Sequence, residues 1–217
     1  MNVNPSAIKV LCYGDSNTWG QKPDKTGRYA ADVRWTGQLQ KMLGDDYYVV
    51  EEGLGSRTTD LEYDRKPGRN GKTYLTPCVA SHTPLDIVVI MLGTNDLKSE
   101  FGRTAEEIAT AVGGLADDVR KYATTATGKS PHVIVMSPAT INANAPTFAE
   151  FYTGYYDKSS MEESEKLASA LQRLANTKEC TFLDAAEVAE AGEDGLHLDE
   201  KSQARLAELV HQALVDL

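Results

Sequence analysis

The sequence is poor in the residues that usually build metal sites. It has three cysteines, and no CxxC pair or HExxH segment occurs, so a dedicated zinc site has little support. The cysteine count is odd, and Cys12 and Cys180 lie in apolar runs, which favours buried, unpaired thiols. We therefore expect no metal and no cofactor.

Long apolar runs are also missing. No run approaches the roughly 20 residues that a membrane-spanning helix needs. The first ten residues, MNVNPSAIKV, lack a charged region followed by an apolar stretch, so they do not resemble a signal peptide. These absences predict a cytoplasmic protein without a membrane partner.

Positive charge is in short supply. The 217 residues include 22 basic and 32 acidic side chains, a net charge of -10. Such a chain is unsuited to phosphate backbones and anionic lipid surfaces, which disfavours nucleic-acid or membrane partners. We expect a small, neutral or weakly charged molecule as substrate. The length and a hydrophobic content of 41% suit one domain over residues 1–217.

Apolar runs of strand length alternate with amphipathic stretches along the chain. The runs are IKVLCYG (8–14), YYVVEEG (47–53), LDIVVIMLG (85–93), HVIVMS (132–137) and CTFLDA (180–185). The nearly continuous apolar character of 85–93 is typical of a strand covered on both faces. Strand–helix alternation predicts parallel strands with right-handed crossovers. The expected fold is α/β, a flavodoxin-like three-layer α/β/α sandwich with a five-stranded parallel sheet.

Helices are predicted between these runs. A first helix is expected over 31–43, and Thr104 with Glu107 has the spacing of a capping box. Ser160 with Glu163 repeats that spacing, and Asp199 is a candidate N-cap for a last helix. Segments 57–81 and 138–158 are interpreted as long irregular loops.

The stretch VLCYGDSNTWG (10–20) places a serine directly after the first strand. Ser16 could be a turn or capping residue, or a nucleophile beside free backbone N–H groups. Gly55 and Ser56 follow the second strand, and Asn95 in GTND follows the third. Ligands of parallel sheets bind beyond the carboxyl ends of the strands, so these residues should share one rim.

A serine nucleophile needs a base. The four candidates are His82, His132, His197 and His211. His197 lies in EDGLHLDE, three residues after Asp194. A D-x-x-H turn can hold an aspartate against the imidazole and fix its tautomer, although a loop turn with a chance histidine is the alternative.

An acyl-transfer intermediate also needs donors for its negative oxygen. The side-chain amide of Asn95 and backbone N–H groups of GLGSRTT (53–59) could supply them, or both segments could merely shape turns.

Taken together, these segments resemble the SGNH, or GDSL-type, hydrolase superfamily. GDSN (14–17), Asn95 in GTND and DGLH (194–197) match its first, third and fifth blocks. The resemblance implies that Ser16 is the nucleophile, His197 the base and Asp194 its partner. It also implies an oxyanion hole made by the Ser16 and Ser56 N–H groups and the Asn95 amide. Glycine is usual at the second-block position, so Gly55 remains an alternative to Ser56.

Further segments are similar to the bacterial arylesterase/acyltransferase branch. They are DVRWTG (32–37), EEGL (51–54), SRTT (56–59) and DIVVIMLGTND (86–96). That branch implies hydrolysis of short-chain acetyl and aryl esters, with acyl transfer to alcohols or peroxide in some members, and homo-oligomers. We expect Trp19, Trp35 and the aromatic segment 148–156 either to shape a small acyl pocket or, for the tryptophans, to pack in the core.

Four other functions stay open. A carbohydrate acetylesterase or a thioesterase would use the same residues. A nucleotide-binding doubly wound protein would explain GLGSRT, although Thr58 stands where its fingerprint requires a third glycine. A non-catalytic binding module could keep the fold without turnover.

Overall fold

A five-stranded parallel sheet forms the centre of the computed structural model, which describes residues 2–217. The strands are β1 (Ile8–Gly14), β2 (Tyr47–Gly53), β3 (Ile87–Met91), β4 (His132–Ser137) and β5 (Thr181–Asp184). Their order is β2-β1-β3-β4-β5, and all neighbouring pairs are parallel. Each strand coincides with a predicted run, although β3 and β5 are shorter than 85–93 and 180–185.

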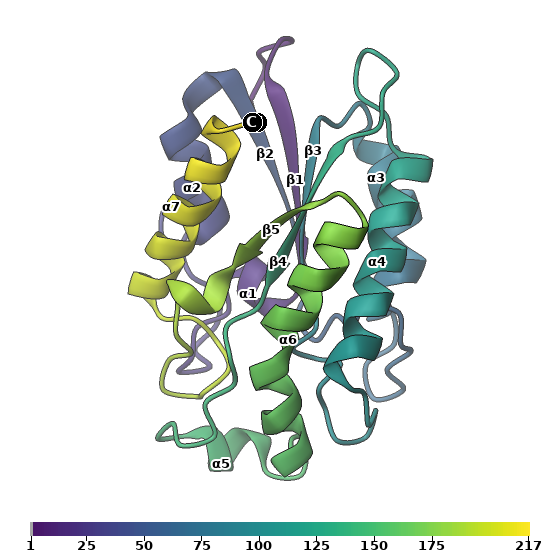
Figure 1. Ribbon diagram of the computed structural model, residues 1–217. Coiled ribbons are helices and arrows are strands. Elements are labelled where there is room, and N and C mark those ends of the chain that lie inside the picture. Colours follow the sequence, from purple (N-terminus) through teal and green to yellow (C-terminus); the bar gives the residue numbers. More distant parts are fainter. Residues whose placement is uncertain (1) are drawn as a thin grey trace.

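Helices cover both faces of the sheet (Figure 1). One face carries α2 (Trp35–Leu43) and α7 (Glu200–Val215), and the other carries α3 (Gly71–His82), α4 (Ala105–Tyr122) and α6 (Lys158–Thr177). Alternate side chains of β1 enter the two cores, Val10 and Cys12 toward α2 and α7, and Leu11 and Tyr13 toward α3, α4 and α6. The predicted three-layer sandwich is confirmed.

The structure corrects two predicted helix starts. The helix expected over 31–43 begins only at Trp35, because Arg34 has a non-helical backbone with a ψ of 141° and its side chain reaches Glu51 on β2. Asp157, rather than Ser160, caps α6. Glu163 is unavailable for capping this helix because its carboxylate accepts the backbone N–H of Ala105, 2.7 Å away, at the start of α4. The capping box predicted for α4 at Thr104 and Glu107 is present.

The prediction that 57–81 is irregular is wrong for its second half. Asn70 accepts the N–H of Thr73 and caps α3, which runs to His82. Pro77 inside the helix and Gly71 at its start hid the pattern. The segment 138–158 likewise contains the short helix α5 (Phe148–Tyr152).

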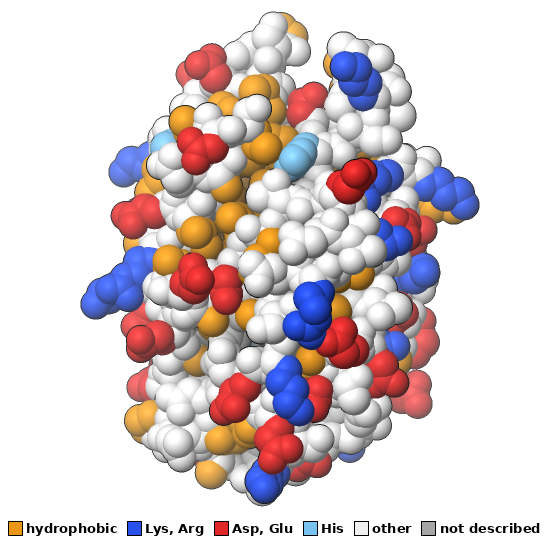
Figure 2. All heavy atoms as spheres, in the orientation of Figure 1, with side chains coloured by type: hydrophobic (Ala, Val, Ile, Leu, Met, Phe, Trp, Pro, Cys, Tyr) orange, Lys and Arg blue, Asp and Glu red, His pale blue; other side chains and the backbone are white. Residues whose placement is uncertain are grey.

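The loops beyond the carboxyl ends of the strands carry the candidate site. There the chain forms the short helix α1 (Ser16–Trp19), and α5 lies at the end of the molecule opposite the C-terminus (Figure 1). Short 3-10 turns at Gly44–Asp46 and Ala185–Glu187 complete the elements. On the face shown in Figure 2, acidic and basic side chains are interspersed. Within residues 2–217, no helix is both long and apolar enough to cross a bilayer.

Candidate active site

Ser16 begins α1, directly after β1. Asp15 caps this helix by accepting the N–H of Asn17 at 2.9 Å, and Gly20 ends it in a left-handed conformation with φ 86°. The sharp strand-to-helix turn places the hydroxyl of Ser16 at the floor of a cavity, where its side chain is buried.

The structure brings Ser16, His197 and Asp194 together in one chain of hydrogen bonds. Nε2 of His197 lies 2.9 Å from Oγ of Ser16, and Nδ1 of His197 lies 2.6 Å from Oδ2 of Asp194. Ser16 and His197 are 181 positions apart in the sequence, so only the fold makes this contact. The arrangement can move a proton from the serine hydroxyl to the imidazole while the carboxylate fixes the ring.

The DGLH turn holds its own carboxylate rigidly. Oδ1 of Asp194 accepts the backbone N–H groups of Leu196 and His197 at 2.9 and 2.8 Å. Gly195 is required between them because its φ is +75° and a Cβ there would lie 2.1 Å from the carbonyl oxygen of Asn142. The carboxylate of Asp194 thus has a fixed direction before it meets the imidazole.

Lys25 adds a positive charge behind the imidazole. Its Nζ lies 2.6 Å from Oδ2 of Asp194 and 3.2 Å from Nδ1 of His197, and the Tyr152 hydroxyl donates to the same carboxylate at 3.0 Å. Burial alone would raise the pKa of Asp194, but hydrogen bonds from His197 and Lys25 outweigh it and hold that pKa well below its usual range. Asp194 is therefore an anion at any pH near neutrality.

Asn17 clamps the loop that carries His197. Its Nδ2 donates to the carbonyl of Leu196 at 3.2 Å, and its Oδ1 accepts the N–H of Leu198 at 3.0 Å. These contacts fix the backbone on both sides of the histidine. Sequence reasoning assigned this side chain no role, because the contact joins residues from opposite ends of the chain.

The loop after β2 reaches the same cavity. Ser56 lines the cavity, and its φ of +66° is a left-handed conformation that favours glycine. Arg57 anchors the turn, since its Nη1 donates to the carbonyl of Gly14 at 2.8 Å and its guanidinium stacks 4.1 Å above the ring of Tyr13. The backbone N–H groups of Ser16 and Ser56 donate to no group within residues 2–217.

Asn95 lines the cavity from the loop after β3. One N–H of its amide donates to Oδ2 of Asp15 at 3.1 Å, and its Oδ1 accepts from Nζ of Lys98 at 2.6 Å. An amide nitrogen carries two hydrogens, so one remains for a ligand. Sequence reasoning overlooked Lys98, although its position three residues after Asn95 suits a contact across one turn.

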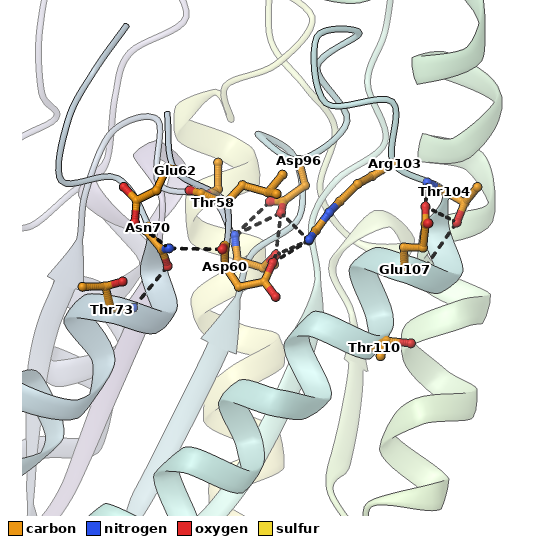
Figure 3. Close-up of polar contacts among 12 residues, drawn as sticks. Thr58, Asp60, Glu62, Asn70, Thr73, Asp96, Arg103, Thr104, Glu107 and Thr110 are labelled. Carbon is orange, nitrogen blue, oxygen red and sulfur yellow. Dashed lines mark hydrogen bonds and ion pairs between the residues drawn. The ribbon is translucent and has the colours of Figure 1, made fainter. Parts of the chain in front are cut away.

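A buried carboxylate joins the two loops. Asp96 accepts the N–H of Thr59 at 3.0 Å and its hydroxyl at 2.5 Å. Arg103 lies between Asp96 and Asp60, at 3.4 and 2.7 Å (Figure 3). Burial raises the pKa of Asp96 to about 6, against the opposing hydrogen bonds from Thr59. The network fixes the loop of Asn95 against the loop of Ser56.

The cavity above Ser16 has a volume of about 250 Å³, at the small end for ligand pockets. Its wall contains both aromatic and polar side chains. The lining residues are Ser16, Gln21, Lys25, Ser56, Tyr63, Lys66, Asn95, Lys98, Phe151, Tyr152, Tyr155, Tyr156, Leu196 and His197.

The sequence predicted the aromatic residues of the cavity wall only in part. The segment 148–156 lines the cavity as expected, but Trp19 and Trp35 do not. Trp35 is fully buried in the core under α7, and Trp19 packs under the guanidinium of Arg28 at 5.2 Å. Tyr63 takes part instead, although its sequence context gave no sign of it.

The other histidines lie outside this cavity. Within residues 2–217, ligand atoms of Glu52, Cys78 and His82 come within 4.8 Å of one another, a grouping that could hold a metal ion. Glu52 already accepts from His82 at 3.0 Å, and burial raises the pKa of the Cys78 thiol to about 12, so that the thiol is protonated near neutrality.

The sequence matches the model of the GDSL-like Lipase/Acylhydrolase family over residues 12–205. The chain belongs to this family. The predicted resemblance is thereby confirmed, and the chain is an esterase/acylhydrolase of the SGNH fold.

Several members of the SGNH fold group are similar over nearly the whole chain. An aryl esterase from M. smegmatis, with inhibitor bound, is 37% identical with a TM-score of 0.88, covering 97% of this chain and 100% of that one. A carbohydrate acetylesterase from Sinorhizobium meliloti is 37% identical with a TM-score of 0.86, covering 96% and 99%.

A curated relative gives a more distant match. An acetylxylan esterase from Xylanibacter ruminicola is 27% identical over 96% of this chain. The chain spans 43% of the length of that relative.

Proposed function

We propose that this chain hydrolyses small carboxylic esters, acetyl esters above all, through an acyl-enzyme on Ser16. The observation that carries the proposal is the chain of hydrogen bonds from Ser16 through His197 to Asp194 at the floor of a cavity. Serine hydrolases on unrelated folds use this arrangement to make a hydroxyl nucleophilic.

The mechanism follows from the hydrogen bonds. Oγ of Ser16 attacks the ester carbonyl as Nε2 of His197 removes its proton. Asp194 keeps the ring oriented and stabilises the imidazolium. The N–H groups of Ser16 and Ser56 and the amide of Asn95 bind the oxyanion, and His197 returns the proton to the departing alcohol. Water, or a second alcohol in acyl transfer, then releases the acyl group.

The leaving group defines a second candidate. The M. smegmatis aryl esterase supports an aryl or simple alcohol, whereas the acetylxylan esterase and the S. meliloti carbohydrate acetylesterase support an acetylated sugar. The small cavity suits an acetyl group in either case.

We also propose that the chain forms homo-oligomers, because its sequence resembles the bacterial arylesterase/acyltransferase branch, for which homo-oligomers are expected.

Covalent labelling tests the assignment of Ser16. A fluorophosphonate probe should label wild-type protein at Ser16, and folded Ser16→Ala protein should remain unlabelled. Ser16→Ala should also fail to hydrolyse 4-nitrophenyl acetate. Ser6→Ala, at an exposed serine, is the matched control and should keep both the labelling and the hydrolysis. Label at another residue, or full turnover by Ser16→Ala, would contradict the proposal.

A further inference from the structure

The charged side chains that line the candidate cavity are basic, although the protein is acidic overall. The chain carries a net charge of -10, yet three lysines and no aspartate or glutamate stand among the lining residues within 2–217. Low-dielectric walls focus the field of such a cluster into the cavity. Overall charge alone favoured a neutral or weakly charged substrate, so the cavity calls for a separate explanation.

Among the three lysines of the cavity, Lys98 is the one whose burial most needs an explanation. Its side chain is more than nine-tenths buried, and no carboxylate of residues 2–217 lies within 4 Å of its ammonium. The ammonium has three N–H donors, of which Asn95 accepts one at 2.6 Å. Tyr63 lies beside it, with its ring centroid 4.8 Å away. Burial lowers the pKa of Lys98 to about 8, against the opposing charges of Asp15 and Asp96, which do not contact the ammonium directly. An anion bound in direct contact would relieve this cost of burial.

The other two lysines differ in how their charge is balanced. The ammonium of Lys25 is matched by the carboxylate of Asp194 at 2.6 Å. Lys66 instead donates to the neutral hydroxyl of Ser56 at 3.0 Å and has no carboxylate of residues 2–217 within 4 Å. Two lysines that form no direct ion pair, Lys98 buried and Lys66 exposed, therefore line the same cavity.

We infer that the preferred substrates are small esters that carry a carboxylate, held by Lys98 and Lys66 while Ser16 attacks the ester. This inference rests on the proposed esterase function. Charge-assisted hydrogen bonds from ammonium to carboxylate are about twice as strong as neutral ones, so they can select a substrate rather than merely accept it. The carboxylate could belong to the acyl part or to the alcohol part of the ester, since both are attached to the carbonyl carbon that Ser16 attacks.

Two matched ester pairs separate these sources. For the alcohol side, 4-acetoxybenzoate is compared with its methyl ester. For the acyl side, mono(4-nitrophenyl) glutarate is compared with 4-nitrophenyl valerate. Each rate is corrected for the reaction seen with Ser16→Ala. In at least one pair, we expect wild-type kcat/KM for the anionic ester to exceed that for the neutral ester by about 10-fold at low salt. This preference should shrink as salt rises.

Neutral variants test the residues. Lys98→Met should reduce the anionic-to-neutral ratio of kcat/KM by about 10-fold, and Lys66→Met should reduce it less because its ammonium is exposed. Lys41→Met, at an exposed lysine of α2 outside the cavity, is the matched control and should keep the wild-type ratio.

The outcomes are distinguishable. If both pairs were hydrolysed without a preference for the anionic ester, the inference would be overturned and the proposed function would stand. An equal loss of kcat/KM on all four esters in Lys98→Met would have the same consequence, because it would mean that the lysine serves the oxyanion through Asn95. Failure to hydrolyse any of the four esters, with Ser16 unlabelled by fluorophosphonate, would overturn the proposed function and the inference together.

Discussion

Asn17 is a polar side chain whose importance depends entirely on its distant partners. It spans the two backbone groups that flank His197, and all of these groups are buried. Truncation of the Asn17 side chain would leave the buried carbonyl of Leu196 and the buried N–H of Leu198 without these hydrogen-bond partners. The consequence should appear in both folding and turnover.

We expect Asn17→Ala to lower the free energy of unfolding by about 2 kcal/mol because two buried backbone groups lose their hydrogen bonds. It should also lower kcat by roughly 10- to 100-fold because the imidazole loses its fixed position. Urea unfolding and steady-state kinetics on 4-nitrophenyl acetate measure the two effects. Asn144→Ala, at an exposed asparagine, is the control. Normal kcat in a destabilised Asn17→Ala protein would show that the clamp serves stability alone.

Ser56 combines a strained backbone with a proposed role for its N–H. A non-glycine residue in the left-handed region costs about 1 kcal/mol, and β-branched residues fare worse there. We therefore expect Ser56→Gly to be the more stable and more active protein of the pair Ser56→Gly and Ser56→Val. Thermal unfolding and ester hydrolysis of the two variants provide the comparison. If Ser56→Val were equal to Ser56→Gly in both, the left-handed turn would not be required.

At the scale of elements, the loops after β2 and β3 depend on one buried carboxyl group. Asp96 has its pKa raised to about 6, mainly by burial. A raised pKa means that the folded state keeps a proton that the unfolded chain releases above its ordinary pKa. The stability from this group is therefore fully present below the unfolded pKa and is lost as pH rises toward 6.

The contribution of Asp96 to the free energy of unfolding should fall by roughly 1.4 kcal/mol for each pH unit as pH rises from about 4 to about 6. Asp96→Asn should remove that component, so the difference between wild type and variant should change with pH and level off above pH 6. Urea unfolding at half-unit pH steps measures it. Asp32→Asn, at an exposed aspartate, is the control. Parallel curves for wild type and Asp96→Asn would contradict the interpretation.

At the scale of the whole molecule, the family resemblance implies assembly. Light scattering coupled to size exclusion should give a mass of two or more chains for the wild type. Ser16→Ala should give the same mass, because the serine side chain is buried. A single-chain mass at every concentration, with full esterase activity, would rule out oligomerisation as a requirement.

The sequence by itself determined the sheet, its layers and the family. Strands that are buried on both faces require continuous apolar runs, and such runs are visible along the chain. The motifs that indicate the family are short stretches of neighbouring residues, so they can also be recognised without the structure. It missed α3, where Pro77 and Gly71 disguise the helix, and it misplaced the cap of α6, where Glu163 serves a neighbouring helix.

Only the tertiary structure decided how charge and polarity are distributed around Ser16. The Asn17 clamp, the pairing of Lys25 with Asp194 and the burial of the Lys98 ammonium against Asn95 each depend on contacts in three dimensions. Electrostatic energy depends on distance in space and on burial, and neither quantity can be read from positions along the chain.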